Sequence, residues 1–182
     1  MARVLVLGAG FGGLAAAKEL RSILPGGDEV VVVSVSDRFF MGFAKLWDLA
    51  GWRPLEEGTR SLASLRDHGI TFVQAEVTAI EAASAGVSTT SGDLTGDALL
   101  VALGTVPSPD HVALIGAGGA HNLYDARELP AMRAALAEIT SGRVVVAILG
   151  GPFKCPPAPY ETAFMLHDYL SRPGVRDAVT ST

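Results

Sequence analysis

A glycine-rich segment near the start of the chain has the residue types and the spacing of a nucleotide-phosphate site. The segment consists of Gly8, Ala9, Gly10, Phe11, Gly12 and Gly13. It matches G-x-G-x-x-G, in which the glycines permit a tight turn, close approach of a pyrophosphate, and close packing of a helix on a strand. The N-terminus of the following helix then faces the anion. We therefore predict a dinucleotide site here, the alternative being only a tight turn between a strand and a helix.

Polar residues that could hold the ribose of a dinucleotide come after the next predicted strand. An acid about 20 residues beyond the glycines usually accepts hydrogen bonds from the ribose hydroxyls. Asp37 is the nearest acid, slightly beyond that position, and it follows Ser36. Two interpretations stay open: Asp37 binds the ribose, or Ser36 binds it while Asp37 caps a turn. Arg38 could instead neutralise a phosphate.

The single cysteine of the chain, Cys155, lies in a second segment that could do chemistry. Lys154 precedes it, and Pro156 and Pro157 separate it from a predicted helix. The thiolate is the reactive form of cysteine, and free cysteine has a pKa of about 8.5. A neighbouring cation and a helix N-terminus both favour the anion, so the flanking residues predict a reactive thiolate. The alternative is an inert buried cysteine, which is the commoner fate of a lone cysteine.

These segments depend on strands and helices that hydrophobic patterning predicts. Arg3–Leu7 is typical of a buried strand, and apolar residues recur at helical spacing over Phe11–Leu24. A second buried strand is predicted over Glu29–Val35. Strand, helix and strand form one βαβ unit, whose crossover should be right-handed.

Further along the chain, the same kind of patterning predicts more helices and strands. In chain order we predict a helical or irregular segment over Phe39–Trp52, a helix over Arg60–His68, a strand over Ile70–Ala75, an antiparallel hairpin or meander over Val77–Leu94, and a buried strand over Ala98–Leu103. After a proline-containing boundary we predict a helix over about Arg127–Thr140, a buried strand over Arg143–Leu149, a loop over Gly150–Pro159 and a helix over about Tyr160–Leu170.

Composition excludes several classes of protein. The chain has 182 residues, of which 49% are hydrophobic, 18% are charged and 21 are Gly, with a formal net charge of -5. This mixture argues against disorder and suits a buried parallel sheet. Because no Lys/Arg cluster occurs, we expect no nucleic-acid partner.

Localisation and metal content follow from other residue types. One cysteine cannot form an internal disulfide, the apolar runs are far shorter than a membrane span, and Gly8 and Gly10 interrupt any signal peptide. We therefore expect a cytoplasmic location. No metal site is expected, because metal-ligand spacing is absent among His68, His111, His121 and His167.

The run from Lys154 through Cys155, Pro156, Pro157, Ala158, Pro159 and Tyr160 to Glu161 resembles the redox-cysteine segment of sulfide:quinone oxidoreductases and flavocytochrome c sulfide dehydrogenases. These enzymes are FAD-dependent pyridine nucleotide-disulfide oxidoreductases. The turn Ala102-Leu103-Gly104 is similar to the one beside the flavin in flavoproteins with two dinucleotide-binding domains, the alternative being an ordinary βα turn. The resemblance covers essentially the whole chain.

The resemblance implies FAD as the cofactor, with the glycine turn at its pyrophosphate and Ala102, Leu103 and Gly104 on the flavin side. It also places Val77 among the cofactor-binding residues. It implies that Cys155 lies over the flavin and forms a persulfide or thiol adduct, and that electrons pass to a quinone or haem partner. Glu161 is implied near the flavin, the alternative being a solvated acid at a helix N-terminus.

Several features of the family do not occur in this sequence. A second cysteine is absent, and so are the late Thr…Gly-Asp motif and the quinone-binding C-terminal region. A second full glycine motif is absent as well, because the Gly150-Gly151-Pro152 stretch lacks G-x-G-x-x-G. The aromatic residues could pack in the core or line the adenine or flavin side; they are Phe39, Phe40, Phe43, Trp47 and Trp52.

The expected fold is α/β: an FAD/NAD(P)-binding Rossmann-like domain with a β-meander insertion over 1–108, lacking its C-terminal return, and the start of a second Rossmann-like domain over 109–182 that carries the redox cysteine. The expected function is FAD-dependent oxidation of sulfide or a low-molecular thiol through Cys155, with a quinone-type acceptor. One alternative is an NAD(P)H-dependent flavin oxidoreductase resembling NADH dehydrogenases or persulfide reductases. Another is a non-catalytic dinucleotide-binding fragment or subunit. A homo-oligomer and a peripheral membrane contact, through a region absent here, stay open.

Overall fold

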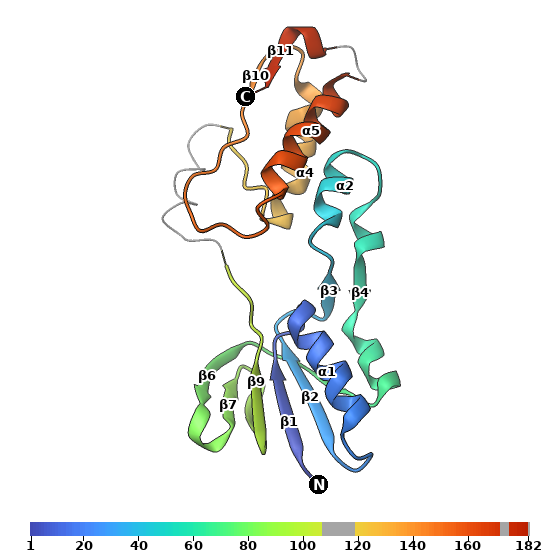
Figure 1. Cartoon of the computed structure of the whole chain (residues 1–182), viewed down its shortest axis with the longest axis vertical. Coiled ribbons are helices and arrows are strands. Elements are labelled where there is room, and N and C mark those ends of the chain that lie inside the picture. The colour runs from blue at the N-terminus through green and yellow to red at the C-terminus, as the bar shows by residue number, and fades with distance from the viewer. Residues whose placement is uncertain (107–118, 172–174, 182) are drawn as a thin grey trace. The chain divides into compact units, whose positions relative to one another are not determined.

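The computed structural model describes residues 1–106, 119–171 and 175–181 (Figure 1). The chain forms two compact units. A short excursion, Gly42–Gly58, leaves the first unit for the second and then returns. The first unit comprises Met1–Met41 and Thr59–Thr105, and the second comprises Gly42–Gly58 and Val106–Thr182. The division into domains after residue 108 stays a prediction.

A four-stranded parallel sheet forms the centre of the first unit, with strand order β5-β2-β1-β9. The strands are β1 (Arg3–Leu7), β2 (Glu29–Ser34), β5 (Thr71–Gln74) and β9 (Ala98–Val101). Helix α1 (Phe11–Ile23) connects β1 to β2. The predicted βαβ unit and the α/β fold class are therefore confirmed. Strand β2 is one residue shorter than predicted, and Val35 beyond it is exposed.

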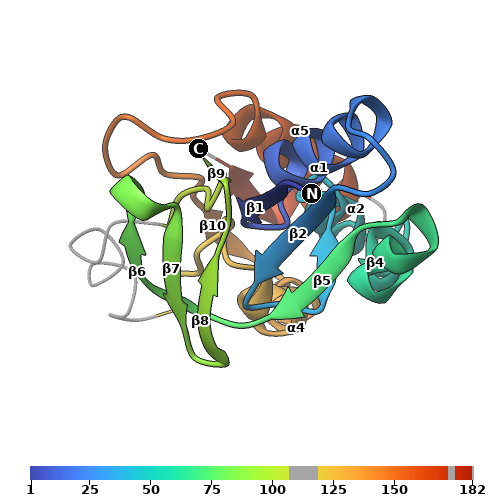
Figure 2. The same cartoon turned by 90° about the horizontal axis from the view of Figure 1, so that it is seen from below.

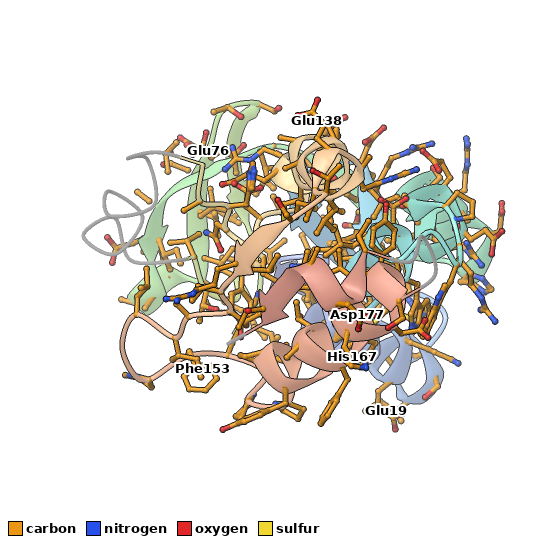
Figure 3. All side chains as sticks on the ribbon, turned by 90° about the horizontal axis from the view of Figure 1, so that it is seen from above. Glu19, Glu76, Glu138, Phe153, His167 and Asp177 are labelled. Atoms are coloured by element: carbon orange, nitrogen blue, oxygen red, sulfur yellow. The ribbon has the colours of Figure 1, made fainter. Side chains whose placement is uncertain are left out.

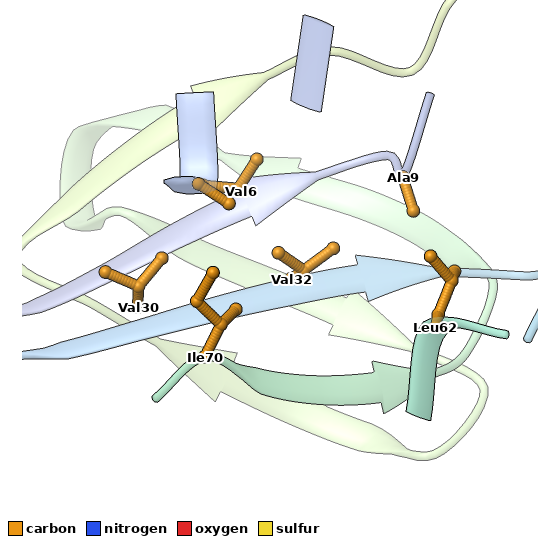
Figure 4. Packing of buried hydrophobic residues seen from close by; sticks show 7 residues of the cluster. Val6, Ala9, Val30, Val32, Leu62 and Ile70 are labelled. Carbon is orange, nitrogen blue, oxygen red and sulfur yellow. The ribbon is translucent and has the colours of Figure 1, made fainter. Parts of the chain in front are cut away.

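The aliphatic runs of β1 and β2 are fully buried because both faces of the sheet are covered. Successive side chains of a strand point to opposite faces. Val6, Val30 and Val32 pack in one cluster (Figure 4). Ala17 of α1 belongs to the same cluster. Leu5, Leu7, Val31 and Val33 form the other cluster, together with Val87 from the inserted meander. A sheet covered on both faces selects continuous hydrophobic strands rather than alternating ones.

The inserted meander is an antiparallel three-stranded sheet, as predicted (Figure 2). Its strands are β6 (Val77–Glu81), β7 (Gly86–Thr89) and β8 (Gly92–Thr95), with the 3-10 turn η3 (Ala82–Ser84) after β6.

A short antiparallel ribbon flanks the excursion into the second unit. It pairs β3 (Arg38–Phe40) with β4 (Thr59–Ser61). The prediction of an α-helix over Arg60–His68 is wrong: β4 leads into a 3-10 helix, η2 (Leu62–His68). The hydroxyl of Ser61 accepts a hydrogen bond from the Ala63 N–H and caps that helix.

The second unit has a helical core (Figure 1). Its helices are α2 (Ala44–Leu49), α4 (Leu129–Glu138) and α5 (Ala158–Ser171). Leu46 of α2 packs with Met165 of α5, while Leu49 packs with Leu129 and Met132 of α4. The remaining elements are η1 (Leu55–Gly58), η4 (Ala126–Glu128), η5 (Arg176–Ala178) and the parallel strands β10 (Gly142–Val144) and β11 (Val179–Ser181).

The prediction of a buried strand over Arg143–Leu149 is wrong for most of its length. Strand β10 ends at Val144, where its pairing with β11 ends. Val145, Ile148 and Leu149 are 60%, 47% and 48% exposed. Among the helices of the described ranges, none has the length and apolar character needed to cross a membrane.

Candidate functional site

The glycine turn between β1 and α1 packs so closely that two of its glycines have no space for a side chain. A Cβ on Gly8 would overlap the carbonyl oxygen of Ala102, and Gly8 has a φ of +101°, which favours glycine. A Cβ on Gly13 would overlap the carbonyl oxygen of Gly8. A Cβ on Gly10, by contrast, would meet no atom within 4 Å. The turn is therefore tight at its base and open at the position where a pyrophosphate would approach the backbone.

Three strand ends meet at this turn. The N–H of Gly8 donates to the Val33 carbonyl over 2.8 Å, and the N–H of Ala102 donates to the Leu7 carbonyl over 2.8 Å. Ligands of open α/β sheets bind outside the carboxyl ends of the strands. The structure thus brings the predicted glycine turn together with the predicted Ala102–Gly104 turn, at the end of the sheet where a ligand is expected.

The neighbouring predicted residues lie around this end of the sheet in different settings. Leu103 is 53% exposed, and Gly104 has a φ of +78° with open space around it. Phe11 lies at the start of α1, and its ring meets the Phe39 ring edge-on, with centroids 5.0 Å apart. Val77 begins β6 and packs on the cluster at the face of the sheet away from α1.

The residues after β2 have distinct hydrogen-bonding roles. The Ser36 hydroxyl accepts from the Arg38 N–H over 3.1 Å and donates to the Arg38 carbonyl over 2.9 Å. Asp37 is exposed, and its carboxylate has no hydrogen-bond or ion-pair partner in the described part of the chain. Its backbone carbonyl accepts from the Leu62 N–H. Ser36 is thus engaged within the turn, whereas the carboxylate of Asp37 is available to a ligand.

Cys155 belongs to the second unit and is exposed, so the expectation of a buried cysteine is wrong, while its reactivity stays a prediction. It has a φ of +56°, which is uncommon outside glycine, and its carbonyl accepts the N–H of Ala158, the first residue of α5. Figure 3 labels Phe153 in the same loop, two residues before the cysteine. The loop therefore presents the sulfur to solvent just before α5. Glu161 lies in the first turn of α5 and is also exposed.

Two residues that the sequence did not indicate, Lys45 and Tyr124, interact electrostatically with Cys155. The ammonium of Lys45, on α2, donates to the Tyr124 carbonyl over 2.8 Å and lies 5.7 Å from the centre of the Tyr124 ring. Burial lowers the pKa of Lys45, the charge of Lys154 lowers it further, and Asp125 and Cys155 act in the opposite direction. Burial raises the pKa of Tyr124, and the charge of Cys155 adds to this effect. No spacing signal links these residues, since only folding brings α2 to the cysteine loop.

The other sequence candidates have structural roles. Among the described residues no group of three or more His, Cys, Asp or Glu side chains could hold a metal; His111 lies outside the described ranges. Trp47 packs with Leu46 in the core of the second unit, and the guanidinium of Arg53 lies 5.2 Å from the centre of its ring. Phe39 packs against the core of the first unit.

Comparison with known proteins identifies the family of this chain. The family model described as pyridine nucleotide-disulphide oxidoreductase matches residues 2–153, which include the glycine turn and the whole parallel sheet. The chain belongs to that family. Its proteins are FAD-dependent oxidoreductases. The tight glycine turn, with open space at Gly10, fits the pyrophosphate of FAD.

Individual relatives of the chain include quinone reductases. The chain is 30% identical to a sulfide-quinone reductase of Aquifex aeolicus, over 98% of this chain and 42% of the relative. It is 32% identical to the demethylphylloquinone reductase NdbB of Synechocystis, over 94% of this chain and 44% of the relative. The solved sulfide:quinone oxidoreductase of Aquifex aeolicus matches with a TM-score of 0.84 and 28% identity, over 98% of this chain and 42% of that one. The chain thus spans less than half the length of these relatives.

Proposed function

We propose that this chain takes part in the FAD-dependent oxidation of sulfide or a low-molecular thiol at Cys155, with a quinone as the final electron acceptor. The observation that carries the proposal is the exposed Cys155 in the loop just before α5, directly after Lys154 in the chain. The similarity to a sulfide-quinone reductase over nearly the whole chain supports the choice of sulfur as the substrate. The similarity to two quinone reductases supports the acceptor.

The chemistry at Cys155 balances as a two-electron oxidation. The Cys155 thiolate and a hydrosulfide ion form a sulfur–sulfur bond, giving a persulfide anion, one proton and two electrons. The hydrosulfide S–H bond breaks, and its proton passes to solvent at the exposed loop. FAD, when bound, supplies the two-electron acceptor chemistry, and a quinone takes up the electrons with two protons. The protein presents the sulfur and places cations near the reacting anions.

We assign the cofactor-binding roles in the first unit from the free groups at the end of its sheet. The backbone of the glycine turn would hold the pyrophosphate, and Asp37 would accept hydrogen bonds from the ribose, because the Ser36 hydroxyl is already engaged. Ala102, Leu103 and Gly104 would lie on the flavin side. Val77 and Glu161 keep the cofactor and catalytic roles that the family resemblance implied.

The test is the absorbance of the purified chain reconstituted with FAD, followed while sulfide is added without oxygen. We expect sulfide to bleach the flavin band. Cys155→Ser should abolish this bleaching while keeping the FAD content, because the substitution removes only the reacting sulfur. The matched control is Ser171→Ala, at the far end of α5, which should bleach like the wild type. A Cys155→Ser variant that bleached at the wild-type rate would remove the cysteine from the mechanism.

A second candidate function, an NAD(P)H-dependent quinone reductase, is favoured by one observation. The Synechocystis relative is named as a quinone reductase without reference to sulfide, and it is 32% identical to this chain. The same spectroscopic experiment separates the two candidates. Bleaching by NADH and not by sulfide would select the second candidate and overturn the first. A chain that cannot be reconstituted with FAD would favour the non-catalytic subunit over both.

A further inference from the structure

The aromatic residue in the glycine turn has no part in the geometry that a phosphate requires. The motif needs glycine at defined positions, whereas its fourth residue, here Phe11, can be of any type. Phe11 begins α1 and is 56% exposed. Its ring meets the Phe39 ring at an angle of 88°, with the ring centroids 5.0 Å apart. This contact therefore joins the glycine turn to the segment that follows β2.

Phe39 is anchored independently of this contact. It is the central residue of β3 and pairs with Arg60 of β4. Its side chain packs on the core cluster that contains Ala9 of the glycine turn and Leu62 of η2 (Figure 4). Strand pairing and the core thus set the position of the Phe39 ring, and the more exposed ring of Phe11 packs against a fixed support.

Asp37 lies just before β3, in a connection that hydrogen bonds restrain on both sides. The Ser36 hydroxyl bonds to the N–H and the carbonyl of Arg38, and the Asp37 carbonyl accepts the Leu62 N–H over 2.8 Å. The Asp37 side chain itself is exposed. Any displacement of β3 relative to the glycine turn would therefore move the Asp37 carboxylate as well, and the contact between Phe11 and Phe39 opposes such a displacement.

We propose that Phe11 and Phe39 are positioning residues that fix the spacing between the glycine turn and the Asp37 carboxylate, so that the site matches the pyrophosphate and the ribose hydroxyls of one ADP group. This assignment deepens the proposed function and rests on the role given there to Asp37. The pyrophosphate and the ribose of ADP are covalently joined, so both sets of contacts form together only where the protein already has the right spacing. Preorganisation of this kind raises affinity, because less conformational freedom is lost on binding.

The test measures, by isothermal titration calorimetry, the affinity of the full chain without FAD for ADP and for dideoxyadenosine diphosphate, which lacks both ribose hydroxyls. The ratio of the two dissociation constants reports the recognition of those hydroxyls. We expect the wild type to prefer ADP roughly tenfold. Phe11→Leu should lower this preference roughly two- to tenfold, the range expected from one aromatic contact. A change in the glycine turn or in overall stability weakens both ligands and cancels in the ratio.

Further variants sharpen the result. Phe39→Leu should lower the preference like Phe11→Leu, which provides the test alone if the more buried substitution does not fold. Phe11→Tyr retains the ring and should keep the wild-type preference. The matched control is Ile23→Ala, which removes a 66% exposed apolar side chain at the other end of α1 and should also keep it. Combined with Asp37→Asn, Phe11→Leu should cause no further loss of preference, because the group that it positions is already altered.

A folded Phe11→Leu variant with the wild-type preference for ADP would overturn the proposal. So would an equal loss in Ile23→Ala, because that would indicate a general effect on α1. A wild-type chain without any preference would overturn the proposal together with the ribose role of Asp37. The sulfur chemistry fails separately: if the preference falls as expected but sulfide does not bleach the flavin, the positioning residues stand and only the reaction at Cys155 is wrong.

Discussion

Gly10 and Gly13 occupy the same turn, and the structure predicts opposite consequences for replacing each of them with alanine. At Gly13 a Cβ would overlap the carbonyl oxygen of Gly8 and lie 2.9 Å from its carbonyl carbon. Both atoms belong to the backbone of a buried turn, so the strand and the helix must separate. Overpacking of this kind costs about 3 kcal/mol. Alanine recovers about 1 kcal/mol through its higher helix propensity.

The net loss for Gly13→Ala is therefore about 2 kcal/mol, which corresponds to a fall in unfolding temperature of roughly 4–8 °C for a chain of this size. Gly10→Ala should unfold close to the wild-type temperature. Its backbone, with φ of -78° and ψ of -171°, suits any residue, and its Cβ meets nothing within 4 Å. A weaker N-cap costs about 0.5 kcal/mol, and the stiffer unfolded chain offsets a similar amount.

For FAD binding we expect the opposite ranking, with Gly10→Ala the more damaging of the two substitutions. The methyl group of Gly10→Ala would lie where the pyrophosphate approaches the backbone, so we expect a loss in FAD affinity of roughly tenfold or more. The assays are thermal unfolding without cofactor, by circular dichroism, and FAD titration by fluorescence quenching. Equal unfolding temperatures for the two variants would refute the packing argument. Wild-type FAD affinity in Gly10→Ala would refute the position of the pyrophosphate.

The other predictions concern single side chains. Asp37→Asn should weaken FAD binding roughly tenfold or more, because a charge-assisted hydrogen bond is lost, whereas Ser36→Ala should have a smaller effect. FAD titration compares the two variants, and a larger loss of affinity in Ser36→Ala would restore Ser36 as the ribose ligand. Asp48→Ala should lower the free energy of unfolding by about 1–3 kcal/mol, because the buried carboxylate accepts the Leu55 N–H over 3.1 Å. Urea unfolding measures this, and an unchanged midpoint of the urea transition would contradict it. Arg127 holds the pKa of Asp125 at about 2, below its ordinary value of 3.8, so their stabilisation is present above that ordinary value and is lost as the pH falls toward 2. Arg127→Met should therefore lower the unfolding temperature at pH 7 and have a clearly smaller effect at about pH 2, and an equal difference at both would contradict the pairing.

Much of the first unit followed from sequence because its signals are local. The aliphatic runs of β1 and β2, the helical spacing of α1 and the glycines between them each depend on residues close together in the chain. The meander also followed, since turn residues interrupt its short strands. The ribbon of β3 and β4 did not, because its strands are three residues long and pair across the excursion through Gly42–Gly58. The extent of β10 was also predicted wrongly, since its pairing with β11 ends at Val144.

The residues of the candidate site also differ in whether the sequence or the tertiary structure identified their roles. Gly8 and Gly13 followed from residue type and spacing, because a tight turn between a strand and a helix requires glycine at both positions. The reactivity of Cys155 stays a prediction. Tertiary structure decided which groups are free to act on a ligand. It placed Ala102 against the glycine turn and engaged Ser36 within its own turn.

The electrostatic interaction between Lys45 and Cys155 was also decided by tertiary structure. Lys45 and Cys155 lie on α2 and on the loop before α5, far apart in the chain, and the apolar contact of Leu46 with Met165 packs these two helices together. Chemistry that resides in a single residue or a short motif can be read from the sequence. The electrostatic surroundings of that residue depend on which distant segments pack against it, and only the fold determines them.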